Sequence, residues 1–353
     1  MPGRRRPADT AAPLRRSLAA LGLALLLTAL TGCGDDRAQA PPVPAVPAPG
    51  ADARTAPGGE SPFWVDPHGE AARQVAAWEA QGRYDDAQVL RRIAERPLAL
   101  WAPVHDPGPR IRRAAADARA AGRTLVLALH NIPGRDCGQR PAGGARDAGA
   151  YRSWIGALAD ALGDTRALVV LEPGALVHAV DGCTGPEQRA ERYRLLSEAV
   201  GRLKQSRHTK VYLDAGGPDR VPDPKALAEP LKRAGLARAD GFALNVSGFR
   251  TDAAAREYGA ALSRATGGAH FVIDTSRNGE GPLPGEGKQA SCNPPGRALG
   301  AAPTTVTGDP LVDAYLWVKR PGLSDGPCRG GPAAGQWWPE YALGLARRSK
   351  EQP

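Results

Sequence analysis

Aromatic residues are scarce in this sequence of 353 residues, and several common functional motifs are missing. Phe, Trp and Tyr together make up 5% of the chain, with four Phe against seven Trp. No G-x-G-x-x-G follows the first expected strand, which removes the usual reason to expect dinucleotide binding. There is no P-loop and no H-x-x-x-H spacing. We therefore expect no phosphate-binding loop, no metal and no cofactor.

Long apolar runs are also lacking. The apolar run at residues 18–30 is too short to span a bilayer as a mature helix. Hydrophobic residues make up 42% of the chain and charged residues 24%, which is ordinary for a globular protein. The composition therefore excludes a wholly disordered chain and a multi-span membrane protein.

The basic charge is not concentrated in one run. The formal net charge is +9, of which residues 1–32 carry +4 through five Arg and one Asp. The remaining positive charge is dispersed, without a Lys/Arg run interleaved with aromatic residues. We therefore expect no nucleic-acid partner.

The first 33 residues have the pattern of an export signal. Arginines precede the apolar run, which ends in the tetrapeptide LTGC at Cys33. This pattern resembles a bacterial lipoprotein signal, in which the Cys is acylated and becomes the first mature residue. An ordinary secretory signal is the alternative, and a pair of arginines before the run leaves Sec and twin-arginine export both open. Either way, we expect an extracytoplasmic protein, held at the membrane only by a lipid anchor on Cys33 or secreted.

The other cysteines fit that location. If Cys33 carries lipid, an even set remains: Cys137, Cys183, Cys292 and Cys328. Two disulfides are expected in an oxidising compartment, and the sequence allows three pairings.

Composition also divides the chain into segments. Residues 34–62 contain seven prolines and are expected to form an extended, disordered spacer. No second linker of this kind follows. We therefore expect one domain at residues 63–348 and a short tail at residues 349–353.

Within that domain, β-branched and aliphatic runs alternate with helical stretches. Helices are expected at residues 110–121, 150–162, 187–204 and 252–264. The expected strands are at residues 98–101, 124–130, 167–172, 210–214, 241–246, 270–274 and 314–319. Several strands are almost entirely apolar, as in parallel sheets buried on both faces. Seven strand–helix units predict an α/β fold, a closed or nearly closed parallel barrel, with a doubly wound open sheet as the alternative.

Polar residues follow most of these strands, where the function of a parallel barrel is usually found. They are Asp136, Glu172, Asp214, Asn245, Asp274, Lys319 and Asp325. Capping of the next helix explains one such Asp, but not so many at once. Several carboxyl groups suit glycoside hydrolysis, in which one protonates the leaving oxygen and another activates water.

Residues 62 to about 345 resemble glycoside hydrolase family 6, and the endoglucanase branch is closest. The matching stretches are PFWVDP (62–67), NIPGRDC (131–137), VLEP (170–173), VYLDAG (211–216), VIDTSRNG (272–279), CNPPGR (292–297), LWVK (316–319), SDG (324–326) and WWPEY (337–341). The resemblance implies an inverting O-glycosyl hydrolase of the β-1,4-glucanase class with a distorted, TIM-like seven-stranded parallel barrel. It also implies a β-glucan partner, a monomer, and the disulfides Cys137–Cys183 and Cys292–Cys328.

The family's proton donor is missing from this sequence. The donor is the Asp after the Glu-Pro of the third strand, and here that position is Gly174. The Asp that raises the donor's pKa in the family corresponds to Asp136. The Asp proposed as the base, acting through water, corresponds to Asp325.

The substrate-binding positions are partly kept. The resemblance assigns substrate contacts to Trp101, Asp214, Asn245 and Lys319. In contrast, the family's Tyr below the distorted sugar is His130, and a stacking Trp is Ser291. A family Glu is replaced by Leu323. Losses that converge on one cleft predict weak or lost hydrolysis.

Two alternatives stay open. One is a fully active β-glucan hydrolase with a relocated acid. His130 is the candidate for that role, because Glu172 directly precedes a Pro at a strand end and is expected to serve the barrel. The other is a non-catalytic glycan-binding or structural protein of the cell envelope.

Overall fold

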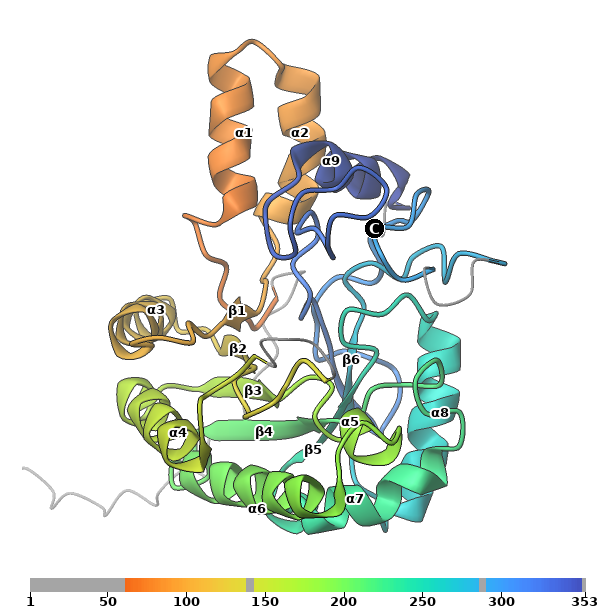
Figure 1. Ribbon diagram of the computed structural model, residues 1–353. Coiled ribbons are helices and arrows are strands. Elements are labelled where there is room, and N and C mark those ends of the chain that lie inside the picture. The colour runs from red at the N-terminus through yellow and green to blue at the C-terminus, as the bar shows by residue number, and fades with distance from the viewer. Residues whose placement is uncertain (1–60, 138–142, 286–289, 351–353) are drawn as a thin grey trace, which may run out of the picture. The chain divides into compact units, whose positions relative to one another are not determined.

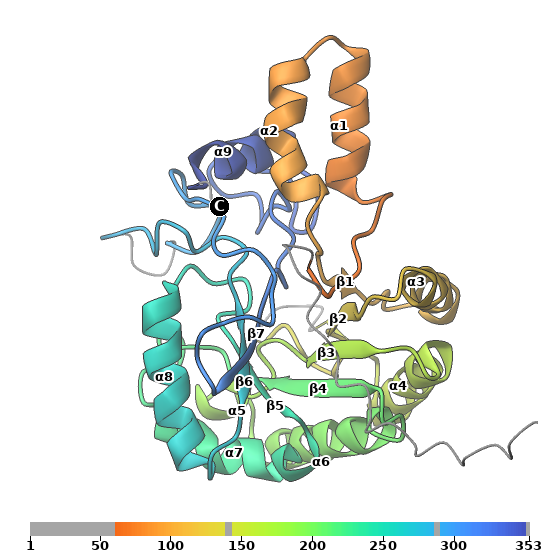
Figure 2. The same ribbon diagram turned by 180° about the vertical axis from the view of Figure 1, so that it is seen from behind.

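Seven short strands form one parallel sheet whose spatial order follows the chain from β1 to β7 (Figures 1 and 2). The computed structural model describes residues 61–137, 143–285 and 290–350. The strands are β1 (Leu100–Trp101), β2 (Leu125–Leu129), β3 (Ala167–Leu171), β4 (Thr209–Asp214), β5 (Gly241–Leu244), β6 (Phe271–Asp274) and β7 (Val312–Leu316). Each predicted strand is present, and the sheet curls into a half-barrel, which confirms the predicted single-domain α/β fold.

Alternation of side chains along each strand separates two cores. In β2, Val126 and Ala128 face the inside of the curled sheet, whereas Leu125, Leu127 and Leu129 face the helices outside. Successive side chains of a strand point to opposite faces of the sheet. Both faces of this sheet are therefore apolar, since one packs against the outer helices and the other fills the inside of the curled sheet.

The predicted helices cover the outer face (Figure 1). They are α3 (Gly108–Ala120), α4 (Ala148–Leu162), α6 (Pro186–Leu203) and α8 (Asp252–Ala265), and shorter elements lie between them: α5 (Val177–Val180), η1 (Pro224–Leu227), α7 (Ala228–Arg233) and η2 (Leu236–Arg238). Asp147 begins α4 by accepting a hydrogen bond from the Ala150 amide (2.7 Å). Gly163, at φ +50°, ends it.

Three further helices form a separate apolar cluster. They are α1 (Glu70–Ala80), α2 (Tyr84–Ala94) and α9 (Pro339–Arg348). Trp78, Leu90, Ile93 and Ala346 are buried in this cluster, so α9 packs against α1 and α2.

The two edges of the sheet meet without a strand ladder. The Ala99 amide donates to the Trp317 carbonyl (2.9 Å), and the Trp101 indole donates to the Val318 carbonyl (2.8 Å). These bonds bring the β1 and β7 edges together at the carboxyl ends of the strands.

The predicted last strand, at residues 314–319, is wrong at both ends. The strand begins at Val312 and ends at Leu316. After it, the amides of Val318 (3.2 Å) and Lys319 (2.9 Å) donate to the carboxylate of Asp274 instead of to a neighbouring strand. A side-chain acceptor therefore ends the strand earlier than its apolar pattern predicts.

The predicted segment boundaries are partly outside the described residues. Residues 1–33 with Cys33, residues 34–60 and the end of the tail are outside. Just before the predicted start of the domain at residue 63, the Ser61 hydroxyl donates to the Pro303 carbonyl (3.0 Å) and the Thr124 amide donates to the Pro62 carbonyl (3.0 Å). Within the described ranges, no helix has both the length and the apolar character needed to cross a bilayer.

Candidate functional site

Asp325 is held between two cations at the carboxyl end of the barrel. Arg277 donates to Asp325 Oδ2 at 2.7 Å, and Lys319 Nζ lies 2.8 Å from Asp325 Oδ1. Burial favours the neutral acid, but the two cations hold the pKa of Asp325 below its ordinary value. Burial and the charge of Arg277 lower the pKa of Lys319. Asp325 is therefore an ionised carboxylate with a fixed orientation.

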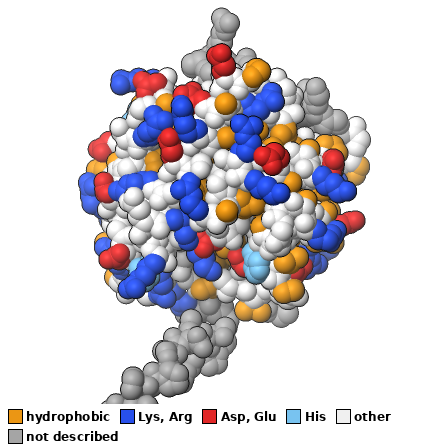
Figure 3. All heavy atoms as spheres, turned by 90° about the horizontal axis from the view of Figure 1, so that it is seen from below, with side chains coloured by type: hydrophobic (Ala, Val, Ile, Leu, Met, Phe, Trp, Pro, Cys, Tyr) orange, Lys and Arg blue, Asp and Glu red, His pale blue; other side chains and the backbone are white. Residues whose placement is uncertain are grey.

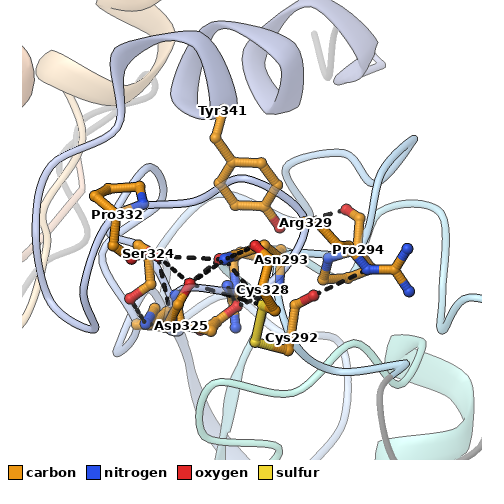
Figure 4. Close-up of a disulfide and its surroundings, with 12 residues drawn as sticks. Cys292, Asn293, Pro294, Ser324, Asp325, Cys328, Arg329, Pro332 and Tyr341 are labelled. Carbon is orange, nitrogen blue, oxygen red and sulfur yellow. Dashed lines mark hydrogen bonds and ion pairs between the residues drawn. A yellow bond between two sulfur atoms is a disulfide. The ribbon is translucent and has the colours of Figure 1, made fainter.

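Asn293 fixes the backbone around that carboxylate (Figure 4). The backbone amide of Asn293 donates to Asp325 Oδ2 (3.1 Å). The side-chain oxygen of Asn293 accepts from the backbone amide of Asp325 (2.8 Å). The Asn293 Nδ2 group donates to the Gly326 carbonyl (2.8 Å). The disulfide between Cys292 and Cys328, one of the two that the resemblance implies, joins the same two loops.

Asp214, at the end of β4, lies against Gly174 in the turn after the neighbouring strand β3. The Gly174 amide (2.8 Å) and the Gly216 amide (3.3 Å) donate to Asp214 Oδ2. Asp214 Oδ1 is buried without a hydrogen-bond partner in the described structure. Burial raises the pKa of Asp214 to about 7. This carboxyl group can therefore be protonated near neutral pH.

A cavity of about 410 Å³ joins these groups. Among the residues that line it are Gly174, Asp214, Asn245, Ser291 and Asp325. The residues that were predicted from β3, β4, β5 and the loop after β7 are thus brought together, and Lys319 reaches the cavity wall through its ion pair with Asp325.

Asn245 supports a loop of this cavity. Its Nδ2 group donates to the carbonyls of Asp274 (2.8 Å) and Arg250 (3.2 Å), and its Oδ1 accepts from the Arg250 amide (3.1 Å). Asn245 has φ +62°, which Asn tolerates better than most residues. Its side chain therefore shapes the loop after β5, and direct contact with substrate stays a prediction.

Trp101, His130 and Asp136 form a second group, which does not line the 410 Å³ cavity. The rings of Trp101 and His130 are 5.7 Å apart in an edge-to-face arrangement. Burial and the nearby cation Arg135 lower the pKa of His130 to about 4, against the opposing charge of Asp136. His130 is therefore uncharged near neutral pH, which argues against its predicted role as a substitute acid.

Glu172 is turned away from substrate chemistry. Its carboxylate accepts hydrogen bonds from the amides of Asn131 (3.0 Å) and Ile132 (2.9 Å). Burial raises the pKa of Glu172 to about 7 despite these donors. Glu172 ties the ends of β2 and β3 together, which agrees with the reason for doubting it as a relocated acid.

Two residues of the site, Arg277 and His178, were not predicted from the sequence. Arg277 had a signal, because it stands in the polar run that follows β6. His178 had little: it is a lone His on the short helix α5, and its only pattern is a spacing of four residues from Gly174.

His178 also lies beside a disulfide, which bears on metal binding. The side chains of Cys137, His178 and Cys183 approach one another within 4.8 Å. Cys137 and Cys183 are joined in the other disulfide that the resemblance implies, so neither offers a thiolate. An imidazole alone is a poor metal site.

Comparison with known proteins gives a consistent result. The sequence model of Glycosyl hydrolases family 6 matches residues 59–349. The chain is 40% identical over 294 residues to Endoglucanase A of Cellulomonas fimi, covering 82% of this chain and 62% of that protein. It is 38% identical over 309 residues to Endoglucanase 1 of Streptomyces halstedii, covering 84% of this chain and 91% of that protein. The chain thus spans less than two thirds of the Cellulomonas protein.

Solved structures show the same likeness. The endoglucanase Cel6 from Mycobacterium tuberculosis, in complex with methyl-cellobiosyl-4-deoxy-4-thio-β-D-cellobioside, superposes with a TM-score of 0.75 at 44% identity. The match covers 82% of this chain and 97% of that one.

Proposed function

Since the chain belongs to glycosyl hydrolases family 6, we propose that it binds β-1,4-glucans and hydrolyses them slowly, with inversion. One observation carries this proposal. The cavity holds an ionised carboxylate, Asp325, and a protonatable one, Asp214, but it has only a hydrogen at Gly174. A positioned general acid contributes about 10²–10⁴-fold to the rate, so its loss slows the cleavage of natural glucans.

We assign the other roles from the family resemblance together with the contacts of Asp325. Asp325 accepts the proton of the attacking water, directly or through a second water, and Lys319 and Arg277 keep it ionised for that purpose. Trp101 provides an apolar face for a sugar ring, and Asp136 is the second carboxyl group near the leaving oxygen.

A leaving-group experiment tests the missing acid. The full chain and its Gly174→Asp variant are assayed on carboxymethyl-cellulose and on 2,4-dinitrophenyl β-cellobioside, whose leaving group needs no proton. We expect Gly174→Asp to raise the cellulose rate by about 100-fold and to change the aryl rate less than threefold.

The position has room for the new side chain. A Cβ at Gly174 would meet only His178, at 3.7 Å from Nε2 and 3.9 Å from Cδ2. The residue has φ +82°, a strained conformation for any side chain but one that Asp and Asn adopt more readily than others. Gly174→Asn is the matched control, because it carries the same strain without an acid. Equal cellulose rates for the wild type and Gly174→Asp would contradict a missing acid.

We also propose that the domain is displayed outside the cytoplasm on a lipid anchor. The pattern that ends in Cys33 and the proline-rich stretch after it support this assignment. The full chain, expressed in a bacterial host, should incorporate labelled palmitate and partition into detergent. Cys33→Ser should remove both properties. Unlabelled wild-type protein in the soluble fraction would instead indicate an ordinary secretory signal.

A further inference from the structure

His178 stands over the place of the missing donor. Its amide donates to the Gly174 carbonyl (3.0 Å), so the two residues are one helical turn apart. Helical side chains lean toward the preceding turn, and residues four apart share a face. The imidazole of His178 therefore covers Gly174, with Nε2 3.7 Å from the point where a Cβ would stand.

A carboxylate orients this imidazole. His178 Nδ1 donates to Asp181 Oδ2 at 3.0 Å, and the Cys183 amide donates to Asp181 Oδ1 at 3.0 Å. Burial favours neutral Asp181, but the His178 and Cys183 hydrogen bonds hold the pKa of Asp181 below its ordinary value. The ionised carboxylate keeps the Nδ1 proton in place, as in catalytic His–Asp pairs, and leaves Nε2 toward Gly174.

The surroundings fix this arrangement and connect it to the cavity. The Thr184 hydroxyl donates to the His178 carbonyl (2.9 Å), and the Cys137–Cys183 disulfide anchors the loop that carries Asp181. Gly174 and Val177, the residue before His178, both line the cavity, although the imidazole itself does not.

Several charged or titratable groups face this pair. Arg220 lies 3.8 Å from Asp181, the charge of His178 acts on His130, and Asp214 accepts from the Gly174 amide. The side chain of His178 is 17% exposed, so solvent can return a proton to it.

We propose that His178, oriented by Asp181, is the general acid that supports the remaining hydrolysis in place of the missing carboxyl group. The inference rests on the proposed function. In its doubly protonated form, His178 keeps the Nδ1 proton hydrogen-bonded to Asp181 and passes the Nε2 proton to the glycosidic oxygen as the bond from that oxygen to the anomeric carbon breaks. Water forms the new bond to the anomeric carbon from the opposite face and loses its proton toward Asp325. The neutral imidazole regains a proton from solvent, and the base returns its proton there.

The test compares leaving groups in His178 variants of the full chain. We expect His178→Gln to lower the rate on cellotetraose by about 100-fold and to leave the rate on 2,4-dinitrophenyl β-cellobioside within threefold. Asp181→Asn should lower the ratio of the cellotetraose rate to the aryl-cellobioside rate by a smaller factor. His130→Gln is the matched control, and it should keep the wild-type ratio of the two rates even if binding weakens.

A second variant protects against a purely structural effect. Gly174→Asp combined with His178→Gln should recover hydrolysis of cellotetraose, with a pH profile that differs from that of the wild type because a carboxyl group now supplies the proton. An unchanged ratio in His178→Gln, or a wild type that cleaves only the aryl substrate, would overturn the inference and leave the proposed function standing. A wild type that neither binds cellotetraose nor cleaves either substrate would overturn the proposed function itself.

Discussion

Two buried aspartates at strand ends, Asp214 and Asp274, differ in how their oxygens are used. Both oxygens of Asp274 accept amide hydrogen bonds, from Ser276 and Val318 on one side and Ser247 and Lys319 on the other. Only one oxygen of Asp214 is used in this way. An Asn side chain can therefore replace Asp214 without loss of these hydrogen bonds. At Asp274, the NH₂ group of an Asn would face amide donors.

Asp214→Asn should change how stability depends on pH. The folded-state pKa of Asp214, about 7, lies above the ordinary 3.8, so the folded chain binds this proton more tightly than the unfolded chain. The resulting stabilisation is complete below about pH 4 and is lost as pH rises through about 7. Denaturant unfolding at pH 5 and pH 8 should show the wild type losing on the order of 2 kcal/mol more than Asp214→Asn.

The unfolding free energy of Asp214→Asn should still fall between pH 5 and pH 8, because burial also raises the pKa of Glu172 to about 7. Parallel pH profiles for the wild type and Asp214→Asn would show that Asp214 stays ionised in the folded state.

Asp274→Asn is the contrasting prediction. The NH₂ group of the new Asn would face backbone amides that are themselves donors. At least one buried amide then lacks an acceptor, which costs about 1–3 kcal/mol per group. We expect this variant to unfold at clearly lower denaturant concentration at every pH. A stability equal to that of Asp214→Asn would mean that the bonds to Asp274 contribute little.

At the scale of elements, the Asn245 side chain holds the loop after β5 through three hydrogen bonds. Asn245→Ala removes three hydrogen bonds to Arg250 and Asp274, and it places Ala in a left-handed conformation. We expect a loss of about 2–3 kcal/mol in unfolding free energy and weaker cellotetraose binding by calorimetry. Asn245→Gly keeps the backbone freedom and separates the two causes. Unchanged binding in both variants would show that this loop does not position substrate.

The elements that follow from local pattern were predictable from the sequence. The strands at β2 and β3 are apolar runs buried on both faces. The ends of β4 and β5 carry Asp214 and Asn245, which line the cavity. The end of β7 was not predictable, because the carboxylate of Asp274, more than forty residues earlier, takes up its amides.

The same limit applies to the site. Gly174 and Asp325 could be found from the matching motifs. The role of His178 depends on the position of an imidazole relative to an absent side chain, and no motif records that. Likewise, the low pKa of His130 comes from burial and from Arg135, which only the folded chain brings together.

At the scale of the whole molecule, the two disulfides should differ in what their loss affects. In the chain-entropy view, each closes a loop worth about 3–4 kcal/mol, for sequence separations of 46 and 36 residues. Replacing Cys137 and Cys183 by Ala should also lower the ratio of cellotetraose to aryl-cellobioside rates, because this disulfide anchors the loop in which the Cys183 backbone amide binds Asp181.

Replacing Cys292 and Cys328 by Ala should lower the melting temperature with a smaller effect on that ratio, since Asn293 still joins the two loops. Thermal unfolding and both assays on the two variants measure the difference. An equal change of the ratio in both would show a general loosening of the fold.

The charge pattern on one face of the domain agrees with the proposed neutral polymer substrate. On the face drawn in Figure 3, Lys and Arg side chains are interspersed with Asp and Glu and do not form one basic field. Glucan binding should therefore depend weakly on ionic strength. A large loss of cellotetraose affinity between 50 and 500 mM salt, as rough working limits, would contradict this.

The order of the strands has a consequence for how the chain is made. Each strand hydrogen-bonds to the strand that precedes it in the chain. A chain that leaves the ribosome or a translocation channel from its N-terminus can therefore add strands to the sheet one at a time. The hydrogen bonds from Ala99 to Trp317 and from Trp101 to Val318 need both edges of the sheet, and they become available when the last strand arrives.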